Sequence, residues 1–225
     1  MKDSANRKEE ILTQLVALSN ALGEPAREYV TPSRGNTSAS VDTETFLVKA
    51  SGVSLHDAGP GDFILVDTEK VLSLLDSDAR SEEEIRQGLN EARVDPQSDL
   101  SPSIETITHA LCLRFDDINF AGHTHPAVIK TFIGPGRLPD ATAPPLSPPE
   151  GDWYSSPPLL IPPCEPGLDL ARNIRQRLDD WMDTIGRPPG VILLQEHGLL
   201  ALGTTPEEVL NATAGAVETA RIITG

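Results

Sequence analysis

The hexapeptide Ala121-Gly122-His123-Thr124-His125-Pro126 carries two of the five histidines of the chain, two positions apart. It follows the short apolar run Ile118-Asn119-Phe120, which predicts a β-strand over 118–122 that leads into the motif. Side chains at positions i and i+2 of a strand point to the same face, so the imidazoles of His123 and His125 can reach one point in space. We therefore expect this strand to present two nitrogen ligands to one metal ion.

A zinc ion would suit these ligands. Zn²⁺ binds imidazole nitrogen at roughly 2.0–2.1 Å, and a catalytic zinc has three protein ligands and one open position. The expected third ligand is His197, between the apolar runs 191–194 and 199–202, which predict a hairpin with His197 in its tight turn. A His-x-His pair alone is usually solvated or packed in a core, so the metal interpretation depends on the third histidine and on the rest of the chain.

The composition limits the partners and the location. The 225 residues carry a formal net charge of −16 and are 38% hydrophobic, which is a globular composition. Nucleic acids and anionic membrane surfaces select basic proteins, so neither is an expected partner. An anionic substrate would need a locally positive site, such as a metal ion, backbone N–H groups or a helix N-terminus. Two cysteines, a polar N-terminus and the absence of an apolar run near ~20 residues favour a cytoplasmic protein without a secretory signal or membrane span.

Helical and strand patterns are interspersed along the chain. Apolar spacing predicts amphipathic helices over 8–22 and 168–185, and capping boxes predict helix starts at Ser81 and Thr205. Ser101-Pro102 has the form of an N-cap followed by a first-turn proline, which predicts one more helix. Strands are expected over 45–49, 63–66, 118–122, 191–194 and 199–202, and a polar turn over 33–38.

These elements predict a single α/β domain over 1–225. We expect a three-layer α/β/α arrangement, with helices on both faces of a mixed, largely antiparallel central sheet. A Pro-rich insertion at about 134–166 excludes helix and central strand, apart from a short edge strand over 159–161.

Polar residues outside the histidine motif suggest further parts of a site. Glu105 and His109 lie four residues apart, on one face of the helix expected after Ser101. Glu105 taken alone fits a first-turn carboxylate near the helix dipole, and His109 fits a core histidine or an outer partner of a metal site. The glycine-bearing turns at 33–38 and 50–52 are either ordinary hairpin turns or places where backbone N–H groups meet an anion.

In this order, the motifs resemble those of the class II aldolase and adducin family. They are spread from about Glu9 to about Ile223 and comprise Gly35-Asn36-Thr37-Ser38, Ala50-Ser51-Gly52, Pro102-Ser103-Ile104-Glu105, His123-Thr124-His125 and Glu196-His197-Gly198. Each motif alone is unspecific, whereas the five in sequence are quite specific for the family and much less so for a substrate.

The resemblance implies a role for each matching residue. By that resemblance, the three zinc ligands are His123, His125 and His197, and Glu105 is the catalytic acid/base beside the metal. The positions at which phosphate-binding members hold the substrate phosphate are Asn36, Ser51, Gly52 and Ser103. The resemblance also implies a homotetramer with each active site at a subunit boundary.

The expected function is that of a zinc-dependent, aldolase-type lyase of carbohydrate metabolism, with another divalent metal as the alternative cofactor. It would cleave a carbon–carbon bond next to a carbonyl in a small hydroxylated substrate, with or without a phosphate, while the metal stabilises an enediolate and Glu105 moves the proton. A keto-acid decarboxylase and a sugar-phosphate epimerase are alternatives on the same site. A non-catalytic adducin-like interaction module fits less well, because this chain has all three histidines and the glutamate. A structural zinc also fits less well, because three histidines without a fourth protein ligand leave one metal position open.

Overall fold

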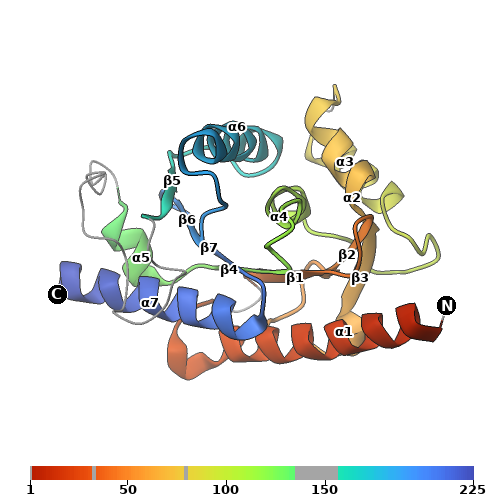
Figure 1. Cartoon of the computed structure of the whole chain (residues 1–225), viewed down its shortest axis with the longest axis horizontal. Helices are drawn as coiled ribbons and strands as arrows, with labels where there is room; N and C mark the ends of the chain where they lie inside the picture. Colours follow the sequence, from red (N-terminus) through yellow and green to blue (C-terminus); the bar gives the residue numbers. More distant parts are fainter. Residues whose placement is uncertain (1, 32–33, 79–80, 135–156) are drawn as a thin grey trace.

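A single mixed sheet runs through the molecule. The computed structural model describes residues 2–31, 34–78, 81–134 and 157–225 (Figure 1). Within these residues, seven strands follow the order β3-β2-β1-β4-β7-β6-β5. The strands are β1 (Asn36–Ser40), β2 (Thr45–Lys49), β3 (Phe63–Asp67), β4 (Phe120–Thr124), β5 (Leu159–Ile161), β6 (Val191–Leu194) and β7 (Gly198–Gly203). Neighbours are antiparallel except β5 and β6, which are parallel, and this confirms the predicted mixed, largely antiparallel sheet.

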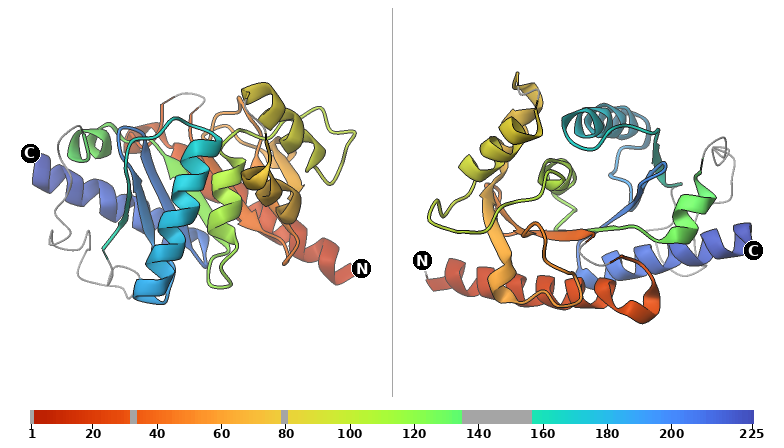
Figure 2. Two further views of the ribbon diagram at one scale, coloured as in Figure 1. Left: turned by 90° about the horizontal axis from the view of Figure 1, so that it is seen from above. Right: turned by 180° about the vertical axis from the view of Figure 1, so that it is seen from behind.

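Helices cover both faces of the sheet, as predicted. One face carries α1 (Lys2–Gly23), α5 (Ala127–Phe132) and α7 (Pro206–Thr224), and the other carries α2 (Thr68–Ser73), α3 (Glu82–Glu91), α4 (Thr106–Leu113) and α6 (Leu168–Ile185) (Figure 1). Short 3₁₀ turns occur at η1 (Pro25–Arg27), η2 (Pro60–Asp62) and η3 (Leu74–Asp76). Helices α4 and α6 lie side by side, and seen from behind, α1 and α7 share the opposite layer (Figure 2).

The sheet separates two apolar clusters because strand side chains alternate between its faces. On β2, Phe46 and Val48 belong to the cluster beneath α4 and α6, whereas Leu47 belongs to the cluster beneath α1 and α7. Burial of each such side chain contributes roughly 1.5–3 kcal/mol to folding. The polar residues of β1 and β4 described below are therefore held between apolar neighbours.

Helix boundaries follow local capping where the sequence signal is strong. Ser81 Oγ accepts from the Glu84 N–H at 3.2 Å, and the Glu84 carboxylate accepts from the Ser81 N–H at 3.0 Å, which closes a capping box before α3. Thr205 and Glu208 form the same box before α7. Both predicted helix starts are confirmed.

Two local predictions were wrong. The segment predicted as a turn over 33–38 contains the start of β1, because Asn36 and the residues after it pair with β4. The helix predicted from Ser101-Pro102 begins only at Thr106, since Pro102 bridges to Ala50 and the Ser101 carbonyl accepts from the Ser51 N–H at 2.9 Å. Pairing with distant strands therefore overrides the local turn and N-cap preferences.

Most of the predicted Pro-rich insertion at about 134–166 lies outside the described residues. Its described end contains the short edge strand β5, as predicted, which pairs with β6. The extent of a single domain over 1–225 stays a prediction. None of the helices in the described parts of the chain combines the length and apolarity needed to cross a lipid bilayer.

Candidate metal centre

The three predicted histidine ligands come together at one end of the sheet. His123 lies within β4 and His125 directly after it, and their ring centroids are 4.4 Å apart. His197 lies in the turn between β6 and β7, and its ring centroid is 5.0 Å from that of His123 and 4.9 Å from that of His125. Because β4 pairs directly with β7, the hairpin carries His197 beside the other two rings.

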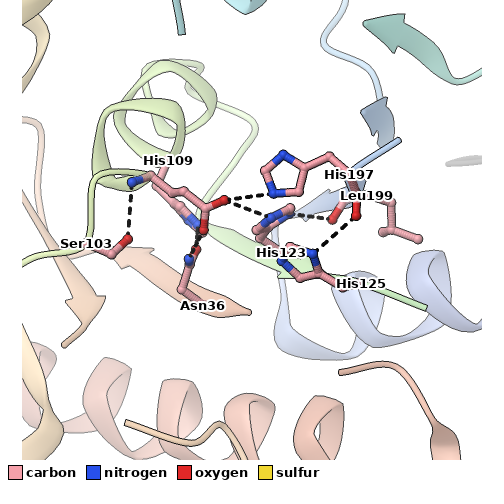
Figure 3. A network of polar contacts seen from close by, with 8 residues as sticks. Asn36, Ser103, His109, His123, His125, His197 and Leu199 are labelled. Carbon is pink, nitrogen blue, oxygen red and sulfur yellow. Dashed lines mark hydrogen bonds and ion pairs between the residues drawn. The ribbon is translucent and has the colours of Figure 1, made fainter. Parts of the chain in front are cut away.

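Backbone carbonyls orient two of the rings. His123 Nδ1 lies 2.9 Å from the Leu199 carbonyl and His125 Nδ1 lies 3.2 Å from the His197 carbonyl, so each Nδ1–H donates to an oxygen (Figure 3). A neutral ring held in this way keeps its lone pair on Nε2. With its hydrogen on Nδ1, His123 has no hydrogen on Nε2 to donate, and this buried nitrogen faces only the Glu105 carboxylate, at 3.2 Å, so a metal ion could bind between the two lone pairs.

A glycine permits the close approach of the two strands. The turn places Glu196 at a φ of 63°, and Gly198 follows His197 as the first residue of β7. A Cβ at Gly198 would lie 2.3 Å from the Thr124 carbonyl oxygen. Only glycine fits here without a change in the spacing between the end of β4 and the turn that holds His197.

Glu105 completes the cluster. Its Oε1 lies 3.2 Å from His123 Nε2 and 3.1 Å from His197 Nε2. One potential ligand atom from each of Glu105, His123, His125 and His197 lies within 4.8 Å of the others. Three nitrogens and one carboxylate oxygen are a donor set that Zn²⁺ and other borderline divalent ions accept, so the residues fit such an ion.

The electrostatics of the cluster also favour a cation. Burial opposes ionisation of Glu105, but the charges of His123 and His197 outweigh it and hold the pKa of the carboxyl well below its usual value. Burial likewise disfavours a charged His123, yet Glu105 raises its pKa. Burial and the charge of His123 lower the pKa of His125 to about 3, so this ring stays neutral and able to ligate.

A cavity of about 220 Å³ opens beside the cluster, and seven of the eight predicted site residues line it. The seven are Asn36, Ser51, Gly52, Ser103, Glu105, His125 and His197. His123 is buried behind them. Three of the residues predicted to bind phosphate already have partners. Asn36 Nδ2 donates to Glu105 Oε2 at 2.6 Å, the Ser51 N–H donates to the Ser101 carbonyl, and the Ser103 hydroxyl accepts from the Glu105 N–H at 3.2 Å.

The same cavity contains two cationic residues that the sequence interpretation missed, Lys49 and Arg34. Lys49 is 2% exposed and its Nζ donates to the carbonyls of Ala50 at 2.9 Å and Val53 at 2.5 Å. Burial lowers the pKa of Lys49 to about 8, although Asp62 and Glu105 oppose this shift. The only sequence signal was a lysine that ends the apolar strand pattern just before Ala50-Ser51-Gly52.

Comparisons with known proteins agree with the fold. The family profile described as "Class II Aldolase and Adducin N-terminal domain" matches residues 13–224. The N-terminal class II aldolase domain of a conserved protein from Thermoplasma acidophilum is similar, with a TM-score of 0.75, 23% identity and coverage of 94% of this chain and 92% of that one. The L-fuculose-1-phosphate aldolase from Thermus thermophilus gives a TM-score of 0.62, 20% identity and coverage of 95% and 92%. No curated protein matches the chain.

Proposed function

The chain belongs to the class II aldolase and adducin family, and on this basis we propose that it is a divalent-metal-dependent lyase that cleaves a carbon–carbon bond next to a carbonyl. The observation that carries the proposal is the cluster of three imidazoles and one carboxylate at the edge of a cavity. His123, His125 and His197 would hold the ion, with Zn²⁺ as the first choice. When bound, the ion supplies Lewis-acid stabilisation of negative charge on substrate oxygens.

Glu105 is the proposed general acid/base. Its carboxylate borders both the histidine cluster and the cavity, so it can reach a proton on a carbon or hydroxyl of a bound substrate. The low pKa of the carboxyl keeps it ionised, and ready to accept a proton, at neutral pH. His109 cannot take this role directly, because it is fully buried behind Asn36.

A small anionic substrate fits the cavity. The chain has a net charge of −16, yet the cationic residues Lys49 and Arg34 are among those that line this small cavity. A phosphate or carboxylate group would find these cations beside the polar residues Ser51 and Ser103. We therefore propose that the substrate is a hydroxylated carbonyl compound that carries an anionic group. Gly52, in the turn that lines the cavity, would leave room for this group and contact it through its backbone.

The test combines metal analysis with product analysis. Protein purified without added metal should contain close to one zinc or similar ion per chain, and it should cleave a sugar phosphate into two carbonyl products. Glu105→Gln should lower kcat by about 10²–10⁴-fold, as loss of a general acid/base does, while the three histidines remain. Glu10→Gln, on the exposed side of α1, is the matched control and should be unchanged.

Other outcomes identify the alternatives. Release of CO₂ from keto acids without aldol cleavage would indicate a decarboxylase, and inversion of a hydroxyl-bearing carbon would indicate an epimerase. Folded protein that binds no divalent ion would refute the enzyme proposal and favour an adducin-like interaction module. We also propose that the protein is cytoplasmic and forms a homotetramer with active sites at subunit boundaries. Light scattering on the purified protein would test the tetramer.

A further inference from the structure

Three buried polar side chains form a row that leads away from Glu105. Asn36, the nearest of them, also lines the cavity, whereas Ser38 and His109 do not. Ser38 and His109 are fully buried and Asn36 is 4% exposed. Their apolar surroundings include the cluster beneath α4 and α6. Buried polar groups in such surroundings are costly unless every donor and acceptor is paired, so their pairing is informative.

Two regular elements place these side chains in one row. Asn36 and Ser38 are i and i+2 on β1, and Asn36 is directly opposite His123 in the β1–β4 pairing. Glu105 and His109 are i and i+4 at the start of α4, which packs over β1 and β4. The row therefore runs from Ser38 through His109 and Asn36 to Glu105. Figure 3 shows the part of this row around His109 and Asn36.

The chemistry of the end groups fixes the direction of every hydrogen bond in the row. An ionised Glu105 only accepts, so Asn36 must present Nδ2 to Glu105 Oε2, at 2.6 Å. Asn36 Oδ1 then faces His109 Nε2, which must carry a hydrogen and donate. His109 Nδ1 is left as an acceptor, so the Ser38 hydroxyl, at 2.6 Å, donates to it. All three hydrogen bonds point toward the carboxylate.

We propose that Ser38, His109 and Asn36 are positioning residues that hold Glu105 in one rotation, with Oε2 tied to Asn36 and Oε1 turned to the histidine cluster. The importance of this role for turnover rests on the proposed function, in which Glu105 moves the proton. His109 acts through Asn36 and does not line the cavity. Burial and the charge of His123 lower the pKa of His109 to about 3, so the ring remains a neutral donor at working pH.

Neutron diffraction on crystals of the zinc-loaded protein tests the hydrogen-bond direction without any assay. Deuterium is expected on His109 Nε2 and none on Nδ1, with the Ser38 deuteron pointing at Nδ1. Deuterium on Nδ1 with a bare Nε2 would reverse the row, turn the Asn36 amide around and overturn the proposal. This result is independent of the substrate and of the reaction.

Kinetics of two His109 variants test the positioning role. His109→Gln keeps an N–H donor near the place of Nε2, whereas His109→Leu removes it. On the substrate identified for the wild type, His109→Leu should lower kcat by about 10–100-fold, with KM and zinc content little changed, and His109→Gln should recover most of the loss. Equal losses in both variants, or none in His109→Leu, would overturn the proposal while leaving the lyase function intact.

A pair of buried serines provides the matched control. Ser38 and Ser19 are both fully buried. Ser38 is part of β1, whereas Ser19 belongs to α1 on the opposite face of the sheet, where its hydroxyl is 2.6 Å from the hydroxyl of Thr37 in β1. Ser38→Ala should lower kcat by up to about tenfold, whereas Ser19→Ala should leave kcat unchanged. Equal kcat values in the two variants would contradict a role specific to the row. If the wild type proves inactive on every substrate, the lyase function fails, and the neutron result alone decides the proposed geometry.

Discussion

Substitution of Gly198 by alanine should distort the proposed metal centre, although Gly198 is not one of its ligands. The new Cβ would lie 2.3 Å from the Thr124 carbonyl oxygen, which is backbone and cannot rotate away. Carbon–oxygen contacts normally need about 3.3 Å or more, so β4 and the start of β7 must separate by about 1 Å. His197 precedes Gly198 and His125 follows Thr124, so the separation acts directly on the distance between two of the three rings.

The expected loss follows from the tolerance of metal sites. Ligand distances must hold within about 0.2 Å of their usual values, and a shift of about 1 Å is several times larger. Relaxation of the exposed turn will absorb part of the strain. We expect Gly198→Ala to weaken zinc binding by at least about 10–100-fold, or roughly 1.4–2.7 kcal/mol. The metal-free variant should lose about 1–3 kcal/mol of unfolding free energy from overpacking.

Zinc affinity from competition with a chelator, together with urea unfolding of metal-free protein, measures both effects. Gly61→Ala is the neutral control, because no atom lies within 4 Å of its new Cβ. Gly122→Ala is the control for overpacking, because its Cβ would meet only side chains, at 2.7 Å from Leu22 and 2.9 Å from Val209. It should lose stability but keep its zinc affinity. Wild-type zinc affinity in Gly198→Ala, or an equal loss in Gly122→Ala, would refute the reasoning.

Three further predictions concern other parts of the chain. Lys49→Met should weaken the binding of inorganic phosphate by about tenfold, because it removes a cation from the cavity. Burial lowers the pKa of Lys49 to about 8, so the phosphate affinity of the wild type, measured by calorimetry, should fall as pH rises through that value. Equal affinity at about pH 7 and about pH 9.5 would contradict this. Burial raises the pKa of the Cys112 thiol to about 12, so a thiol reagent should modify the half-buried Cys164 in native protein and Cys112 only after unfolding, as peptide mapping can verify. Glu196→Gly should raise the urea-unfolding free energy by about 0.5 kcal/mol, since glycine adopts the φ of 63° without strain; a lower stability would show that the turn is not strained.

Sequence patterns predicted the elements whose signals lie within a few adjacent residues. The capping boxes at Ser81 and Thr205 set the starts of α3 and α7, and Gly186 ends α6 in a left-handed conformation with a φ of 78°. The start of α4 and the strand β1 were predicted wrongly. Their conformations depend on pairing with Ala50 and with β4, which no local pattern contains.

The candidate site was predictable where spacing alone determines geometry. The i and i+2 spacing of His123, in β4, and His125, directly after it, brought two rings together, and the hairpin turn brought the third. Asn36 was assigned to substrate binding from its motif, yet its amide nitrogen contacts Glu105 at 2.6 Å, a contact that depends on the packing of α4 over β1. The burial of Lys49 could not be predicted either, because it depends on how the turn after β2 packs in the folded protein.

The hydrogen bonds that assemble the centre join residues 69 to 76 positions apart in the chain. An unfolded chain offers an ion only the weak local pair at His123 and His125, and the remaining ligands arrive once the central strands have paired. The proposed zinc ion should therefore bind late in folding, so added zinc should slow unfolding strongly and accelerate refolding little. A cell that runs short of the metal would then produce this protein at the usual speed but lose it faster to proteases.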